Sequence, residues 1–146
     1  MTVRYISKSD LAQLEELDRK CFPAPVRYNR YTLDYYISLP NSFGLVDIIE
    51  NGVIGFIIVT LSNKSTANIV TIDVDPIYRR HGIGSRLIEI AKRILMESNV
   101  KSITLQVSVD NKIAVNFYKK HGFKVTKTLP MYYPNTDGYH MEYMLG

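Results

Sequence analysis

The chain has 146 residues, enough for one domain with a buried core, and its 46% apolar and 22% charged residues are ordinary for a globular protein. No apolar run approaches the ~18 residues of a membrane-spanning helix, and the first residues lack the apolar core of a secretory signal, so we expect a cytoplasmic protein with no membrane partner. The net charge of +4 favours anionic partners mildly, but no basic tail or stripe points to specific nucleic-acid binding.

The first forty residues predict a short strand and two helices. A strand over Arg4–Ser7 is followed by a helix whose N-cap is Ser9 or Asp10, and which ends at Phe22-Pro23-Ala24-Pro25 because proline cannot continue a helix. The second helix is expected over Thr32–Leu39. The apolar positions of the first helix share one face, at Leu11, Leu14, Leu17 and Cys21. This pattern favours an inert core thiol for the lone cysteine, which has no partner for an internal disulfide.

Strands dominate the rest of the chain. Two of them, Phe43–Ile49 and Val53–Leu61, are joined by Glu50-Asn51-Gly52, in which Asn-Gly predicts a hairpin with positive φ at both of its turn positions. The later elements are expected to be a strand over Ala67–Val74, a helix over Ser85–Ser98, a strand over Ile103–Val109, a helix over Asn111–Lys120, and strands over Phe123–Leu129 and Tyr139–Leu145. This order predicts one α/β domain over residues 1–146, with a mixed sheet and helices on both faces.

The stretch between Val74 and Ser85 predicts an anion site. A strand runs into a short loop with Gly82 and Gly84, and a helix begins directly afterwards. Glycine lets the backbone approach a ligand closely, and the first N–H groups of a helix are unpaired and attract phosphate. Three arginines, Arg79, Arg80 and Arg86, add positive charge at the mouth. A basic turn that merely precedes a glycine-capped helix is the structural alternative.

The glycine spacing narrows the choice of phosphate ligand. Leu87 occupies the third glycine position of a dinucleotide fingerprint, and no GxxxxGK[ST] is present. What remains is Arg79-x-x-Gly82-x-Gly84, which resembles the R/Q-x-x-G-x-G/A pattern that cradles the coenzyme A pyrophosphate in the GNAT acetyltransferase superfamily.

A second motif carries the same resemblance. The segment from Asn111 to Phe123 is similar to the N-x-x-A-x-x-x-Y-x-x-x-G-F element of that superfamily. By resemblance, Asn111 and Ala114 face the pantetheine arm, and the hydroxyl of Tyr118 lies by the thioester sulfur. Structural alternatives are an N-cap role for Asn111 and core packing for Phe117 and Tyr118.

The resemblance implies the GNAT fold, with a mixed, mostly antiparallel central sheet, and acetyl-CoA as cosubstrate without a metal. The residues implied to bind the cofactor are Ile72, Asp73, Val74, Arg79, Arg80, His81, Gly82, Ile83, Gly84, Ser85, Asn111, Ala114, Phe117 and Tyr118.

A closer resemblance is to the N-terminal protein acetyltransferases, including those of the ribosomal-protein alanine type. It covers most of the chain and rests on the segments 78–84, 105–111 and 132–138. In that family a Tyr-Tyr pair after the sixth strand and a Phe-Pro loop after the first helix form the walls of the peptide site. The resemblance therefore assigns substrate binding to Phe22, Pro23, Val26, Tyr28, Tyr132 and Tyr133.

The resemblance also implies direct attack of the amine on acetyl-CoA in a ternary complex. A backbone N–H of Ile72–Val74 would stabilise the oxyanion, an interaction typically worth ~3 kcal/mol, and Tyr118 would be the general acid. Ribosomal-protein acetyltransferases carry a glutamate where this chain has Gln106, and Asn68 occupies the neighbouring strand position. Since neither amide can accept a proton, we expect Gln106 to position a water that relays it to His140 or Glu142.

The missing base favours a substrate that is already neutral. An α-amine has a pKa of ~7.8 and a lysine side chain ~10.4, a difference of roughly 3.5 kcal/mol. We therefore expect acetylation of protein N-termini, with lysine ε-acetylation as a secondary activity.

Other readings stay open at the level of sequence. A small-molecule amine acetyltransferase would need an acidic pocket, whereas the acidic residues are scattered along the chain, and a non-catalytic acetyl-CoA sensor would keep the loop without the chemistry. The cluster of Lys119, Lys120, Lys124 and Lys127 leaves room for weak affinity to ribosomes or nascent chains. A monomer or weak dimer is expected.

Overall fold

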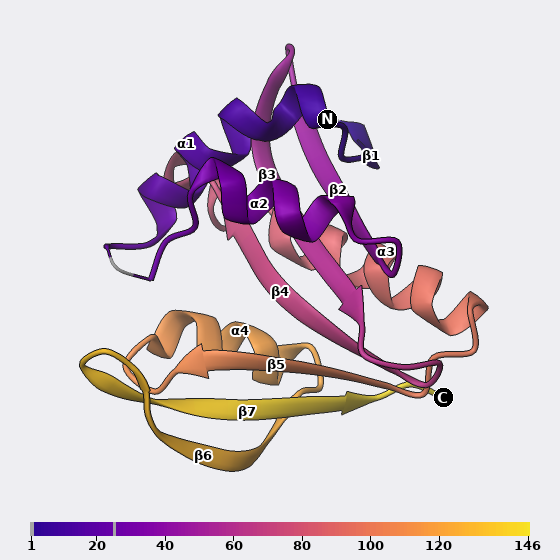
Figure 1. Cartoon of the computed structure of the whole chain (residues 1–146), viewed down its shortest axis with the longest axis vertical. Helices are drawn as coiled ribbons and strands as arrows, with labels where there is room; N and C mark the ends of the chain where they lie inside the picture. Colours follow the sequence, from indigo (N-terminus) through magenta and orange to yellow (C-terminus); the bar gives the residue numbers. More distant parts are fainter. Residues whose placement is uncertain (1, 25) are drawn as a thin grey trace.

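The computed structural model describes residues 2–24 and 26–146 (Figure 1). In chain order its elements are β1 (Thr2–Tyr5), the 3-10 turn η1 (Lys8–Asp10), α1 (Leu11–Cys21), α2 (Arg30–Ser38), β2 (Ser42–Ile49), β3 (Gly52–Leu61), β4 (Thr66–Val74), the 3-10 turn η2 (Pro76–Tyr78), α3 (Ile83–Glu97), β5 (Ser102–Ser108), α4 (Lys112–Lys120), β6 (Lys124–Tyr133) and β7 (Thr136–Met144).

Within the described residues, seven strands form one sheet in the order β1-β2-β3-β4-β5-β7-β6. Only β4 and β5 pair in parallel, and the other neighbours are antiparallel. The α/β class and the mixed sheet are thus as predicted.

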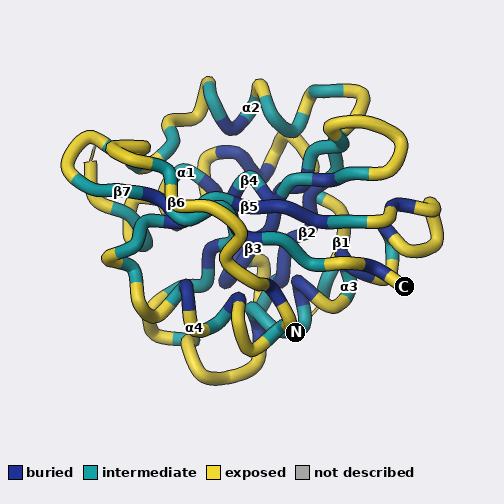
Figure 2. Tube along the Cα trace, turned by 90° about the horizontal axis from the view of Figure 1, so that it is seen from below, coloured by how far each residue is buried: buried dark blue, intermediate teal, exposed yellow. Residues whose placement is uncertain are grey.

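Helices cover both faces of the sheet. Figure 2 shows α1 and α2 on one side and α3 and α4 on the other. Neighbouring residues of β3 point to opposite cores: Phe56 and Ile58 pack with α1 and α2, whereas Ile57 and Val59 pack with α3. Burial on both faces explains why this strand reads as an unbroken apolar run.

The sheet is split between β4 and β5. The two strands pair only from Thr66 to Asn68 on β4, against Ser102 to Thr104 on β5. Beyond Asn68 they diverge, and β4 continues unpaired on this edge to Val74 (Figure 1). Backbone N–H and C=O groups along the split are therefore available to a ligand.

Some boundaries differ from the expectation, and one turn was placed wrongly. Positive φ occurs at Glu50 and Asn51, at 49° and 68°, while Gly52 already pairs with Ile49 as the first residue of β3. The hairpin turn is therefore Glu50-Asn51 rather than Asn51-Gly52. Strand β6 also runs four residues beyond Leu129, because its register shifts before Tyr133 and pairing with β7 resumes there.

Among the described residues, no helix combines the length and the apolarity needed to cross a bilayer.

Candidate active site

The loop before α3 has the geometry of an anion site. Arg80 and Gly82 both have left-handed backbone conformations, with φ of 67° and 77°, and α3 begins at the next residue, Ile83. His81 Nδ1 lies 2.9 Å from the carbonyl oxygens of both Tyr78 and Arg79, which closes the turn. The unpaired N–H groups at the start of α3 thus lie beside two exposed arginines, Arg79 and Arg80, at the end of β4.

Arg86 does not contribute charge to the loop mouth, contrary to the expectation. Its guanidinium forms an ion pair with the fully buried carboxylate of Asp47 on β2. Arg86 lies in the first turn of α3 and Asp47 on β2, so this pair links α3 to the sheet.

The end of β4 has two chemically distinct sides. Ile72 and Val74 pack toward the core shared with α3 and α4. Asp73 points the other way, where it is 1% exposed and accepts a hydrogen bond of 2.7 Å from Thr71 Oγ1. Asp73 can therefore serve a cofactor on the opposite side only through its backbone.

Asp73 faces a second buried carboxyl group, Asp18 of α1. The two lie within hydrogen-bonding reach, and burial followed by Asp18 holds the pKa of Asp73 well above its ordinary value. Asp18 Oδ2 accepts the N–H of Tyr28 at 2.6 Å. Asp18 Oδ1 and Asp73 Oδ2 have no other partner among the described residues. This pair, 55 positions apart in sequence, ties the loop after α1 to β4.

Cys21 lies near Asp73 at the same end of β4. Its thiol donates to the carbonyl oxygen of Val74 at 3.4 Å, and burial and nearby Asp73 raise its pKa to about 12. A thiol held neutral in this way is a poor nucleophile, in agreement with the sequence interpretation.

Tyr118 lies inside the molecule on α4. Asn111 Oδ1 accepts the N–H of Ala114 at 3.2 Å, which caps α4 and sets its direction. The Tyr118 ring packs edge-on against Phe117 and Phe123. Burial, then the neighbouring Asp73 and Tyr133, raise the pKa of Tyr118 above its ordinary value, so the phenol stays protonated and can act as a proton donor.

Phe117 connects α4 to the loop. A Cβ on Gly84 would lie 3.2 Å from Phe117 Cζ, so the small residue at this position lets the ring of α4 approach the first turn of α3.

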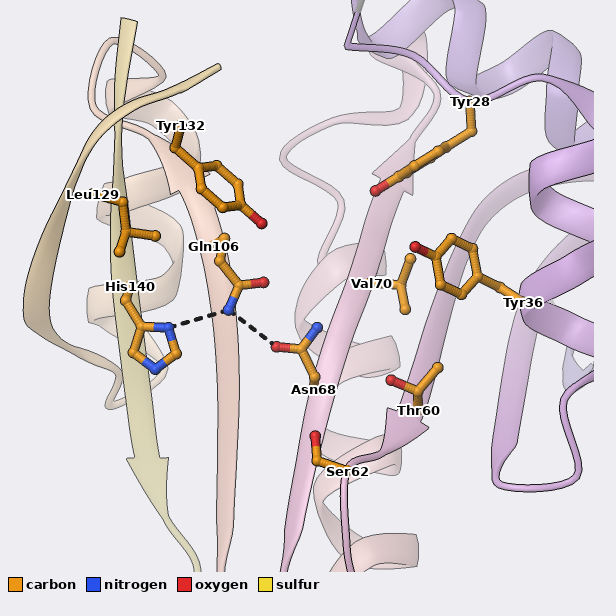
Figure 3. Close-up of a pocket in the computed structure, with 10 residues that line it drawn as sticks. All are labelled: Tyr28, Tyr36, Thr60, Ser62, Asn68, Val70, Gln106, Leu129, Tyr132 and His140. Carbon is orange, nitrogen blue, oxygen red and sulfur yellow. Dashed lines mark hydrogen bonds between the residues drawn. The ribbon is translucent and has the colours of Figure 1, made fainter.

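A pocket of about 480 Å³ opens over the split between β4 and β5 (Figure 3). It is lined by Tyr28, Tyr36, Thr60, Ser62, Asn68, Val70, Gln106, Leu129, Tyr132 and His140. The hydroxyl groups of Tyr28, Tyr36 and Tyr132 point into the same space (Figure 3). None of the described lining residues carries a carboxylate.

Gln106 is held in the floor of this pocket by two partners. Its Nε2 donates to Asn68 Oδ1 at 3.2 Å and lies 3.1 Å from His140 Nδ1. Both amide hydrogens are thereby used, and Oε1 faces the open space toward the tyrosines (Figure 3). Thr104 Oγ1 donates to the same Asn68 oxygen at 2.8 Å, and His140 Nε2 lies 3.7 Å from Glu142 Oε1. The floor of the pocket thus presents a fixed hydrogen-bond acceptor.

The structure brings together some of the residues that the sequence assigned to substrate binding. Tyr28 and Tyr132 line the pocket from opposite sides. Tyr133 packs edge-on against Tyr132, with ring centroids 5.0 Å apart. Phe22, Pro23 and Val26 lie in the loop after α1 but not in the lining of this pocket, so their role remains a prediction.

Sequence reasoning missed Tyr36, Thr60, Ser62, Val70 and Leu129. The alternation of β3 and β4 could have placed Thr60 and Val70 on one face, but nothing in the sequence shows that α2 brings Tyr36 over them.

This arrangement defines a class: a split sheet with an anion loop at the end of one strand and a buried tyrosine beside it suits acyl transfer from a phosphate-containing thioester. A family model described as the acetyltransferase (GNAT) family matches residues 11–123. The chain belongs to this family of acetyl-CoA-dependent N-acetyltransferases.

Three relatives support the assignment. An uncharacterized N-acetyltransferase of Methanocaldococcus jannaschii is 30% identical over 138 residues, covering 94% of this chain and 86% of that protein. An N-alpha-acetyltransferase of Sulfurisphaera tokodaii is 29% identical over 149 residues, covering 92% and 87%. The crystal structure of Ard1 from Thermoplasma volcanium superposes with a TM-score of 0.91 at 31% identity, covering 99% of this chain and 97% of that one.

Among residues 2–24 and 26–146, no cluster of histidine, cysteine, aspartate or glutamate side chains could hold a metal ion. The cosubstrate is acetyl-CoA, and the anion loop and the free edge of β4 are chemically suited to its pyrophosphate and its pantetheine amides.

Proposed function

We propose that this enzyme acetylates the free α-amine of protein N-termini, with lysine ε-acetylation as a slower secondary activity. The observation that carries the proposal is the pocket floor, where Gln106 Oε1 is the fixed acceptor and no carboxylate lies among the described lining residues. Such a site can orient an amine by accepting one of its N–H groups, and it offers no carboxylate to take a proton, which leaves the imidazole of His140 beside Gln106 as the proton acceptor. The site therefore suits an amine that is often neutral near pH 7.

In the proposed reaction, the pyrophosphate of acetyl-CoA binds the loop from Arg79 to Ser85 and the pantetheine arm follows the unpaired edge of β4. A backbone N–H within Ile72–Val74 donates to the thioester carbonyl, and the α-amine attacks the carbonyl carbon directly. The tetrahedral intermediate collapses with cleavage of the C–S bond.

Tyr118 then donates its phenolic proton to the departing sulfur. The proton lost from the amine leaves through water held at Gln106, beside His140, whose Nδ1 is 3.1 Å away. No covalent acetyl-enzyme is required, in keeping with the neutral, half-buried thiol of Cys21.

The substrate peptide enters between the loop after α1 and the β6–β7 hairpin, where Tyr28 and Tyr132 face each other across the pocket. We propose a cytoplasmic enzyme that acts on finished or nascent chains as a monomer or weak dimer. The exposed Lys119, Lys120, Lys124 and Lys127 favour weak attraction to ribosomal surfaces.

The test is transfer of a labelled acetyl group to short peptides that differ in their first residue, each offered with a free and with a blocked N-terminus. Mass spectrometry of the products should locate the label on the α-amine, and blocking should abolish most of the transfer. Transfer to polyamines or aminoglycosides but not to peptides would support a small-molecule enzyme. Tight acetyl-CoA binding without transfer to any amine would support a sensor.

A further inference from the structure

A chain of three polar side chains lies behind the anion loop. His121, which follows α4, places Nε2 at 2.9 Å from Ser85 Oγ on the first turn of α3. Its Nδ1 lies 3.0 Å from Glu89 Oε2, one turn further along α3. These two contacts take up both ring nitrogens, and the His121 side chain is only 10% exposed.

The charges around His121 stabilise this arrangement. Lys92 Nζ donates to the backbone carbonyl of His121 at 2.6 Å and to Glu89 Oε2 at 3.2 Å. Burial alone would raise the pKa of Glu89, but the hydrogen bonds from His121 and Lys92 lower it below its ordinary value. From β7, the ring of Tyr143 packs under Lys92 at 3.9 Å. The cations of α4 itself are the exposed Lys112, Lys119 and Lys120.

The positions of the hydrogen atoms in these contacts follow from the chemistry of the three side chains. The Glu89 carboxylate only accepts hydrogen bonds, so His121 Nδ1 carries a hydrogen. In a neutral imidazole, Nε2 then has a lone pair and takes the only hydrogen of the Ser85 hydroxyl. In an imidazolium, Nε2–H donates to Ser85 Oγ instead, and the hydroxyl hydrogen becomes free for another acceptor.

Ser85 belongs to the first turn of α3, where the proposed function places the pyrophosphate of acetyl-CoA. A phosphate diester at neutral pH is an acceptor only, so the Ser85 hydroxyl can donate to it only when His121 does not take its hydrogen. With a neutral His121, the serine oxygen would present lone pairs to an anion.

From this geometry we propose that coenzyme A binding is coupled to protonation of His121, with Ser85 as the connecting hydroxyl and Glu89 as the counter-ion. The proposal rests on the acetyl-CoA site of the proposed function and adds His121 as a residue that positions the cofactor. Affinity for coenzyme A then falls as the pH rises, by up to about tenfold per pH unit where the coupling is complete.

The test is calorimetric titration of the full chain with coenzyme A at about pH 8, where an ordinary imidazole is largely neutral. Titrations in two buffers with different heats of ionisation give the number of protons taken up on binding. The wild type should take up a substantial fraction of one proton. His121→Gln, whose amide can donate to Ser85 without titrating, should bind coenzyme A with no uptake and with a flat pH dependence.

Two further variants separate this mechanism from a general effect of phosphate charge. Ser85→Ala keeps the imidazole but removes the connecting hydroxyl, and it should lose the uptake. His81→Gln removes the other imidazole of the loop, and it should keep the uptake whatever happens to affinity. Binding of coenzyme A without proton uptake, or uptake that persists in both His121→Gln and Ser85→Ala, would overturn the coupling alone. Failure of the wild type to bind coenzyme A would refute the proposed function itself.

Discussion

Tyr118 combines a buried position with a protonated phenol, which is what a general acid for a thiolate leaving group needs. Tyr118→Phe keeps the ring between Phe117 and Phe123 but removes the proton. We expect kcat to fall by about 10²-fold or more, the usual contribution of general acid catalysis, while the KM for acetyl-CoA changes little. Steady-state kinetics measures both parameters, and an unchanged kcat would show that the thiolate leaves without this proton.

Asp73 changes the pH dependence of stability in the opposite direction from an acid whose pKa is lowered by folding. Its pKa is raised in the folded state, so the folded protein binds a proton that the unfolded chain releases at lower pH. Stability is therefore highest below the ordinary aspartate pKa and is lost as the pH rises through the raised value. Asp73→Asn supplies a permanent donor toward Asp18 and should increase the free energy of unfolding at neutral pH, because the neutral side chain no longer has to hold a proton there.

Asp47 differs from Asp73 because its buried carboxylate pairs with Arg86 rather than with another acid. Asp47→Asn should decrease the free energy of unfolding, by about 1–2 kcal/mol, since a charge-assisted hydrogen bond is lost while the Arg86 side chain, 37% exposed, stays partly hydrated. Urea unfolding of both variants at about pH 5 and pH 8 measures these effects. If Asp73→Asn were destabilising at the higher pH, the two carboxyls would not be sharing a proton.

At the scale of elements, the turn into α3 depends on Gly82. A Cβ there would meet no atom within 4 Å, but φ is 77°, so Gly82→Ala should cost about 1–2 kcal/mol through backbone strain alone. The KM for acetyl-CoA should rise as the loop relaxes. Gly84→Ala is the matched control, since it requires only a small movement of the Phe117 ring. Thermal unfolding and acetyl-CoA kinetics should show the larger effect for Gly82→Ala.

The β6–β7 hairpin provides one wall of the pocket through Tyr132. Tyr132→Ala should raise the KM for peptide by about fivefold to tenfold, the equivalent of about 1 kcal/mol of lost aromatic contact, and should leave the KM for acetyl-CoA unchanged. Tyr31→Ala, at an 86% exposed position on α2 outside the pocket lining, serves as the control. Equal peptide KM values for the two variants would exclude the hairpin from substrate binding.

Most of the fold was predictable from local sequence patterns. Caps, glycines and apolar periodicity located nearly all the elements within a few residues, because each reflects interactions between neighbours in sequence. The errors lie where distant contacts decide: the continuation of β6 depends on pairing with β7, and Arg86 was assigned to the loop because Asp47 is 39 positions away.

The same limit applies to the site. The motif residues of the anion loop were predictable because they are contiguous, and so was the capping role of Asn111. The Asp18–Asp73 pair and the chain from Ser85 through His121 to Glu89 join elements far apart in sequence. Acidic residues that seemed scattered in the sequence thus form a buried pair in the structure, although it does not line the pocket.

At the scale of the whole molecule, the proposed preference for α-amines rests on a pocket whose described lining residues include no carboxylate. Gln106→Glu would place a carboxylate beside Asn68 and His140, at the position of the fixed acceptor. We expect this variant to increase acetylation of lysine side chains relative to N-termini, because a base lowers the cost of deprotonating the ε-amine. Mass spectrometry of peptides that contain both amines measures the ratio, and a ratio equal to that of the wild type would mean that Gln106 does not control amine choice.

The most direct measurement compares kcat/KM for two matched peptides, one with a free N-terminus and one with a blocked N-terminus and a single accessible lysine. The difference between the two amine pKa values predicts a preference for the α-amine on the order of 10²-fold near pH 7. Comparable values for the two peptides would contradict the proposed preference, because the lysine amine, which is neutral far less often near pH 7, would then react as readily as the α-amine.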